Sequence, residues 1–144
     1  MNIKVINGPN LNLLGKRNIN VYGKETLNEI RNWLESKAGD EVLIDWFQSN
    51  HEGKIIDEIH NSLNCEGIVI NPGAFTHYSY AIRDAIESVE IPTAEVHLSD
   101  INNREGFRKR SVIKDVCIGQ ISGLGKTGYP VSYTHLTLPT KRIV

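Results

Sequence analysis

Short apolar runs alternate along this chain with longer segments in which apolar residues recur at helical spacing. The short runs predict strands over residues 2–6, 42–47, 67–70, 93–97 and 115–121, and the spaced patterns predict helices over 25–38, 53–64 and 77–89. This alternating order of strands and helices predicts a parallel sheet covered by helices on both faces. We therefore expect an α/β fold.

Length and composition fit one globular domain. The chain has 144 residues, of which 40% are hydrophobic and 23% charged. Its net charge of −1 favours neither nucleic acid nor an anionic membrane as a partner, and no apolar run reaches the roughly 18 residues of a membrane span. Cys65 and Cys117 lack metal-ligand spacing and are expected to be reduced. Because the chain opens directly with a strand and no signal peptide, we expect a cytoplasmic protein.

Polar side chains capable of chemistry follow three of the predicted strands. These segments are 7–17 (NGPNLNLLGKR), 71–77 (NPGAFTH) and 95–100 (EVHLSD). The carboxyl ends of parallel strands meet at one crevice, so we expect the three segments to form one site. Such a set, with Tyr22 just beyond it, suits acid–base chemistry on a small oxygenated molecule.

Asn10, Arg17 and Tyr22 belong to a long irregular segment after the first strand. A loop of this length in a compact domain is more often functional than passive. If Arg17 approaches Tyr22, its charge lowers the phenol pKa from about 10 and allows Tyr22 to act as a general base. The alternatives are an Asx-type turn at Asn10 and solvated surface positions for the other two.

The segment after the third strand leads into a helix that we expect to begin near Thr76 and His77. Backbone N–H groups at a helix start can bind a carboxylate or a hydroxyl. His77 and Asp84 are seven residues apart and would share one face of that helix. Ordinary helix surface is the alternative for both.

Glu95 and His97 alternate along the fourth predicted strand, so their side chains point to the same face. The carboxylate can hold the imidazole in one tautomer, which suits a general acid or base, with Ser99 following at the strand end. A structural His–Glu pair is the alternative. Arg104 and Arg108 fall on one side if their segment is helical, and one of them can clamp a substrate carboxylate or hydroxyl.

Two other patterns fail as cofactor sites. The segment Gly123-Leu-Gly-Lys-Thr127 resembles the end of a phosphate-binding loop, but Gln120 stands where that motif needs its first glycine. The five histidines show no metal-ligand spacing, so we expect no catalytic metal.

Together these motifs resemble type II 3-dehydroquinate dehydratase, also called type II dehydroquinase. They are N-G-P-N-L-N-L-L-G-x-R from Asn7, Tyr-Gly at 22–23, N-P-G-A-x-T-H from Asn71, E-V-H-x-S from Glu95 and R-E-x-x-R from Arg104. The resemblance implies a flavodoxin-like three-layer sandwich with strand order 2-1-3-4-5, and a homododecamer built as a tetramer of trimers. It also implies reversible dehydration of 3-dehydroquinate to 3-dehydroshikimate in the shikimate pathway of aromatic amino acid biosynthesis, without a cofactor.

The same resemblance implies catalytic roles. Tyr22, as a phenolate, would remove the proton from the carbon beside the ketone, and a water held by Asn10 would donate a hydrogen bond to the resulting enolate. Arg17, on a mobile lid, would lower the pKa of Tyr22 and stabilise the transition state. His97, oriented by Glu95, would protonate the departing hydroxyl.

Substrate binding is implied for a further set of residues. These are Asn71, His77, the backbone at Leu98 and Ser99, and Arg108, while Asp84 would contribute to the site of a neighbouring subunit. One departure lies in the lid, where Asn18-Ile19 replaces the family's usual Glu-Pro. A nucleotide- or flavin-binding module on the same fold, or an inactive subunit, is the alternative function.

The end of the chain departs further from the family pattern, which continues into a C-terminal helix. Residues 131–144 (VSYTHLTLPTKRIV) lack an apolar stripe, and Pro139 interrupts them. Their sequence resembles the translation of a transposon-type sequencing adapter. We therefore expect a catalytic domain over 1–130 and an irregular, loosely attached, non-native tail over 131–144.

Resequencing the source gene across the Pro130 codon tests the origin of this tail. Long reads are expected to diverge from the printed sequence shortly after that codon, because an adapter would have replaced native coding sequence. Reads that encode VSYTHLTLPT within an uninterrupted gene would refute the prediction.

Overall fold

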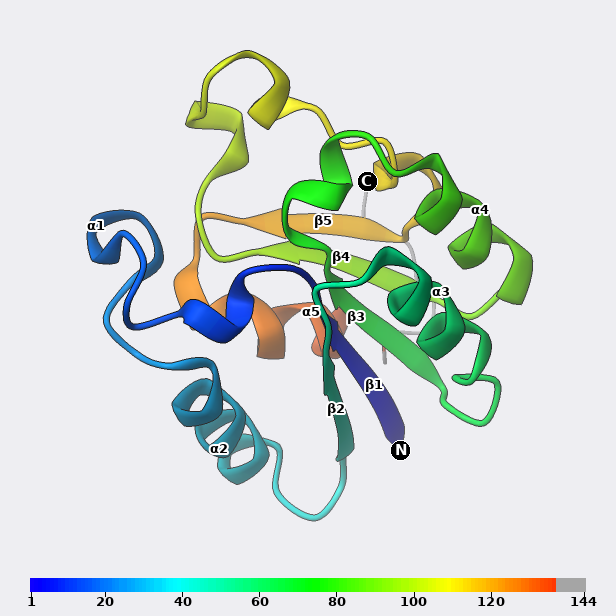
Figure 1. The fold of residues 1–144 in the computed structure, drawn as a ribbon. Helices are drawn as coiled ribbons and strands as arrows, with labels where there is room; N and C mark the ends of the chain where they lie inside the picture. The colour runs from blue at the N-terminus through cyan, green and yellow to red at the C-terminus, as the bar shows by residue number, and fades with distance from the viewer. Residues whose placement is uncertain (137–144) are drawn as a thin grey trace.

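The computed structural model describes residues 1–136 and shows a parallel five-stranded sheet between two layers of helices (Figure 1). The strands are β1 (Asn2–Asn7), β2 (Leu43–Gln48), β3 (Gly67–Asn71), β4 (Thr93–His97) and β5 (Gly119–Ser122). Each neighbouring pair is parallel, in the order β2-β1-β3-β4-β5. The predicted flavodoxin-like strand order is confirmed.

The helices are α1 (Ile19–Tyr22), α2 (Leu27–Ala38), α3 (Glu52–His60), α4 (Tyr80–Val89) and α5 (Gly128–Leu136). Local sequence explains where α2 begins. The Thr26 hydroxyl accepts a hydrogen bond from the Glu29 amide, and the Glu29 carboxylate accepts one from the Thr26 amide. This capping box satisfies two amides that would otherwise lack partners at the helix start.

Alternation along the strands sends apolar side chains to both faces of the sheet. Ile3, Val5 and Val69 pack in a core with α2 and α5. Ile6 and Ile68 pack in a second core with α3 and α4 on the opposite face. The sheet is therefore covered on both sides, and its carboxyl edge stays open for a site.

The predicted start of α4 is wrong. Residues Gly73–His77 form a 3₁₀ turn, and α4 begins only at Tyr80, where the Ser79 hydroxyl accepts a hydrogen bond from the Ile82 amide. His77 therefore precedes α4 and does not share a helix face with Asp84. The fifth strand is also shorter than predicted, because Lys114–Val116 form another 3₁₀ turn.

The predicted irregularity of the tail is wrong for residues 131–136, which continue α5. Tyr129, Tyr133 and Leu136 are buried in the core shared with α2. A side chain at Gly67 would meet Leu136, since a Cβ there would lie 2.9 Å from Leu136 Cδ1. Burial against the sheet thus outweighs the weak helical pattern. Residues 137–144 lie outside the described part of the chain, and the foreign origin of 131–144 stays a prediction.

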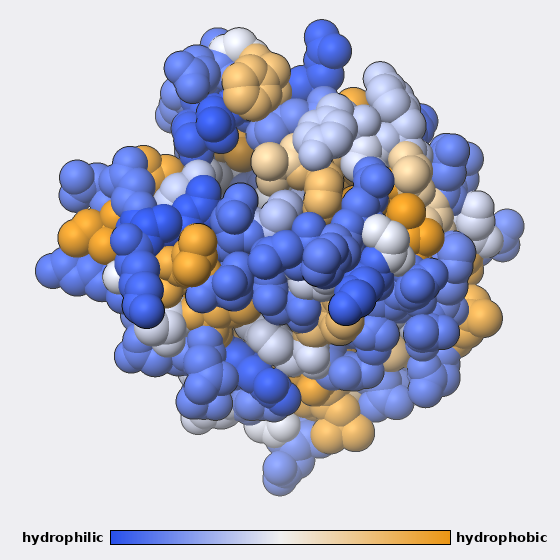
Figure 2. Space-filling model, viewed as in Figure 1, coloured by the Kyte–Doolittle hydropathy of each residue, from blue (hydrophilic) through white to orange (hydrophobic). Residues whose placement is uncertain are grey.

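The outer surface is mixed. Figure 2 shows a largely hydrophilic face on which hydrophobic side chains form small separate groups. Across residues 1–136, no helix is both long enough and apolar enough to cross a membrane.

Candidate active site

One cleft at the carboxyl edge of the sheet is lined by the polar segments that follow β1, β3 and β4. Of the residues singled out in the sequence, it is lined by Asn10, Arg17, Tyr22, Asn71, His77, His97, Leu98, Ser99, Arg104 and Arg108. Glu95 lies behind His97 and is fully buried. Asp84 is exposed on α4 and does not line this cleft. The structure thus brings together all the predicted site residues except Asp84.

The polar segments that follow β1 and β3 meet by a close backbone approach. The Gly8 amide donates a hydrogen bond to the Asn71 carbonyl at 2.7 Å. A Cβ on residue 8 would lie 2.5 Å from the Pro72 carbonyl oxygen, so only glycine fits there. This contact places Asn10 and Asn71 on the same cleft.

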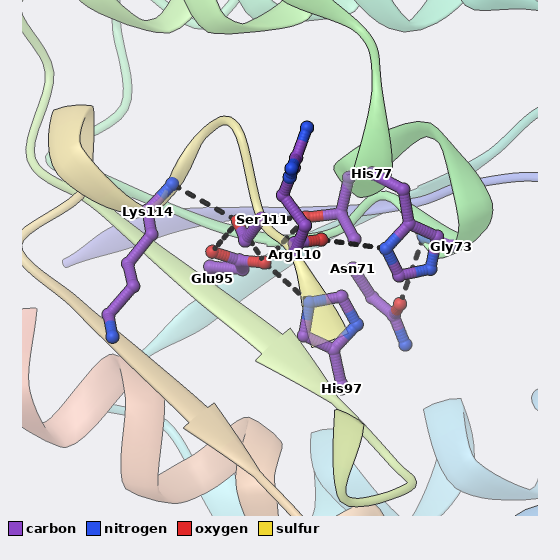
Figure 3. Close-up of polar contacts among 9 residues, drawn as sticks. Asn71, Gly73, His77, Glu95, His97, Arg110, Ser111 and Lys114 are labelled. Carbon is purple, nitrogen blue, oxygen red and sulfur yellow. Dashed lines mark hydrogen bonds and ion pairs between the residues drawn. The ribbon is translucent and has the colours of Figure 1, made fainter. Parts of the chain in front are cut away.

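Glu95 and His97 form a buried pair at the end of β4 (Figure 3). His97 Nε2 lies 2.5 Å from Glu95 Oε2, and the carboxylate also accepts hydrogen bonds from Thr76 Oγ1 at 2.6 Å and Ser111 Oγ at 2.8 Å. Burial alone would raise the pKa of Glu95, but the hydrogen bonds and charge of His97, with the two hydroxyls, lower it overall. An ionised carboxylate therefore anchors His97 and leaves Nδ1 as the ring nitrogen available to a ligand.

His77 is held from a different direction. Its Nδ1 lies 2.7 Å from the Arg110 carbonyl oxygen, to which it donates, and Figure 3 shows the ring beside Asn71 and Gly73. Burial, with the positive charges of His97 and Arg108, lowers the pKa of His77. A neutral imidazole with one fixed N–H suits binding of a hydroxyl.

Tyr22 lies among arginines. The Arg17 guanidinium stacks on its ring, with Cζ 3.9 Å from the ring centroid, and Arg104 Nη1 lies 3.4 Å from the phenolic oxygen. Burial would raise the pKa of Tyr22, but the hydrogen bond from Arg104 and the charges of Arg17, Arg104 and Arg108 lower it overall. This environment favours the phenolate, which is the form that can accept a proton.

Some contacts of the site differ from those predicted from the sequence. Arg104 is predicted only as one of two candidate clamps, and the hydroxyls of Thr76 and Ser111 are not predicted as partners of Glu95. The spacing of R-E-x-x-R was a signal for Arg104. Nothing in the local sequence marked Ser111, because its contact with Glu95 depends on how a distant loop folds back.

Two ionisable side chains of the cleft can exchange protons with a ligand. Among residues 1–136, no group of three or more His, Cys, Asp or Glu side chains is placed to hold a metal ion. The cleft instead places a tyrosine with a lowered pKa and a histidine anchored by a carboxylate on the same cavity. Such a pair can remove one proton and deliver another.

Comparison with known proteins agrees with this geometry. The family model described as dehydroquinase class II matches residues 1–137. The chain is 58% identical to a 3-dehydroquinate dehydratase of Thermotoga neapolitana, over 94% of each chain, and 57% identical to one of Caldicellulosiruptor saccharolyticus, over 90% of this chain and 92% of the relative. The crystal structure of type II dehydroquinase from Butyrivibrio crossotus superposes with a TM-score of 0.93 at 49% identity, covering 96% of this chain and 98% of the other.

The arginines around Tyr22 predict an unusually acidic phenol. In an ultraviolet titration of tyrosinate, one tyrosine should ionise below the usual pKa of 10.0, and this step should be missing from Tyr22→Phe. Arg104→Gln should move the step to higher pH, because it removes a donor and a positive charge. Arg31→Gln, on the outer side of α2, should leave it in place. An unmoved step in Arg104→Gln would contradict the assignment.

Proposed function

Because this chain belongs to the class II dehydroquinase family, we infer that it is a hydro-lyase that dehydrates 3-dehydroquinate to 3-dehydroshikimate, a step of the shikimate pathway. The observation that carries the assignment to this cleft is the pairing of Tyr22, among arginines, with His97, on a buried carboxylate. Family membership favours this enzyme over the nucleotide- or flavin-binding alternative.

Tyr22 starts the proposed reaction as the general base. Its phenolate takes the proton from the carbon beside the ketone, and the electron pair moves onto the ketone oxygen to give an enolate. Arg17 lies against the ring and Arg104 lies at the phenolic oxygen, so both favour the phenolate before the transfer. A water held by Asn10, which lines the same cleft, donates a hydrogen bond to the enolate oxygen.

His97 completes the reaction as the general acid. The enolate collapses to the enone, the bond to the hydroxyl breaks, and a proton from His97 converts the leaving hydroxide into water. Glu95 supports this step because its charge stabilises the protonated imidazole and fixes the ring. Tyr22 gains one proton and His97 loses one in each turnover, so the net proton count of the site is unchanged. Before the next turnover Tyr22 releases its proton to solvent and His97 takes one up.

Substrate binding falls to the remaining lining residues. We assign the carboxylate and hydroxyls of the substrate to Asn71, His77, Arg108 and the backbone at Leu98 and Ser99. Arg108 supplies a positive charge for the carboxylate, and the fixed N–H of His77 leaves its Nε2 for a hydroxyl. We place Arg17 and Tyr22 on a short lid, since Asn18 caps the single-turn α1 and Ile19 begins it.

We also propose that the enzyme works as a homododecamer in the cytoplasm. An interface between subunits is supported by large exposed aromatic side chains near the cleft, Tyr78 at 59%, Tyr80 at 62% and Phe107 at 61%. Asp84 is exposed on α4, and we propose that it reaches the cleft of a second subunit across this interface. The free thiols Cys65 and Cys117 suit a reducing compartment.

Kinetics with 3-dehydroquinate test the assignment, because the conjugated enone of the product absorbs in the ultraviolet. The parent protein should form this product. Tyr22→Phe and Arg17→Ala should each lower kcat by at least about 10²-fold, the usual scale for a general base. The double variant should lose little more than the worse single variant, because both residues serve one proton transfer.

Tyr133→Phe is the matched control and should keep the parent rate, since this tyrosine lies outside the cleft. A parent protein that forms no enone would contradict the function. Fully additive losses in the double variant would show that Arg17 does not act through Tyr22.

A further inference from the structure

A tyrosine of α5, Tyr129, contacts the last residues of β1 and β3 from the face of the sheet that α5 covers. Tyr129 is fully buried, and its ring packs 5.7 Å from the Trp46 ring, centroid to centroid. Its hydroxyl donates a hydrogen bond to Asn7 Oδ1 at 2.6 Å and accepts one from Asn71 Nδ2 at 3.4 Å. Tyr129 does not line the cleft, whereas Asn71 does.

These hydrogen bonds have a fixed direction. Asn7 Nδ2 donates to the Phe47 carbonyl at 3.3 Å, so Asn7 must present its oxygen to Tyr129. The Tyr129 hydroxyl donates its single proton to that oxygen, so it can only accept a hydrogen bond from Asn71. Asn71 must therefore turn its nitrogen toward Tyr129, and its oxygen accepts from the Gly73 amide at 3.3 Å.

The hydrogen bonds from Asn7 through Tyr129 determine which group of the Asn71 amide faces a ligand. A side-chain amide nitrogen carries two protons, and one is directed at Tyr129. The other is left for a ligand in the cleft, which Asn71 lines. Without the Tyr129 hydroxyl, only the Gly73 amide still favours this orientation of Asn71. A flipped amide would present its oxygen to substrate oxygens.

We propose that Tyr129 is a positioning residue for substrate binding, which acts through Asn71 to keep an amide N–H directed at the substrate. This inference rests on the proposed function, since it assigns Asn71 to the hydroxyls or carboxylate of 3-dehydroquinate. It also gives α5 a role in the site. A phenylalanine ring would fill the core equally well. The hydroxyl of Tyr129 is costly to bury, so its presence indicates a role for its hydrogen bonds. Burial raises the pKa of Tyr129, which keeps the hydroxyl a donor.

Steady-state kinetics of Tyr129→Phe test the proposal. The variant keeps the ring but loses the hydroxyl. KM for 3-dehydroquinate should rise roughly fivefold, the scale of one hydrogen bond, while kcat changes less than about twofold. Loss of folded protein lowers the apparent kcat without moving KM, so KM separates positioning from a structural role. Tyr133→Phe, which removes a hydroxyl from the same helix away from the cleft, should keep the parent KM.

A double-mutant cycle identifies the route. In an Asn71→Ala background, Tyr129→Phe should leave KM unchanged, because its partner is gone. Asn7→Ala should raise KM as Tyr129→Phe does, since the tyrosine hydroxyl then loses its acceptor. This variant replaces Tyr129→Phe in the test if Tyr129→Phe does not fold. Parent KM in both Tyr129→Phe and Asn7→Ala would overturn the proposal, as would an equal KM rise from Tyr129→Phe with and without Asn71. A parent protein inactive on 3-dehydroquinate would instead overturn the function.

Discussion

The buried carboxylate of Glu95 is the constraint on which the catalytic edge of this sheet depends. A charge fully removed from water is tolerated only where donors surround it. Here the donors come from three separate segments: His97 on the same strand, Thr76 on the turn after β3, and Ser111 on the loop before β5. Satisfying one carboxylate therefore ties together three parts of the chain that carry or flank the site.

The two groups proposed to transfer protons lie in different surroundings. His97 is set in the sheet and anchored by a negative charge, whereas Tyr22 stands at the end of the single-turn α1 among positive charges. The proposed acid is therefore held in the sheet, and the proposed base lies on the segment between β1 and α2. Two titratable groups in opposite fields are what a reaction needs when it removes one proton and delivers another.

The spacing of apolar residues and the positions of strand ends were enough to predict the sheet and much of the cleft. Alternating strands and helices gave the parallel sheet, and the ends of β1, β3 and β4 located Asn10, Asn71 and His97 on one cleft. What failed depended on tertiary contacts. Thr76 is held in the 3₁₀ turn before α4 by its hydrogen bonds to Glu95 and from the Val112 amide. Helix α5 forms because Leu136 packs against the sheet at Gly67. The partners of Tyr22 and Glu95 come from loops whose path the local sequence does not encode.

The central claim is that Tyr22 and His97 act in separate steps, with an enolate between them. Hydrogen exchange at the carbon beside the ketone, measured by NMR of 3-dehydroquinate recovered from deuterium oxide, tests it most directly. His97→Ala should still exchange this hydrogen while dehydration fails, because Tyr22 can form the enolate and return a deuteron. Tyr22→Phe should lose exchange and dehydration together. Exchange lost to the same extent as dehydration in His97→Ala, or retained in Tyr22→Phe, would contradict the account.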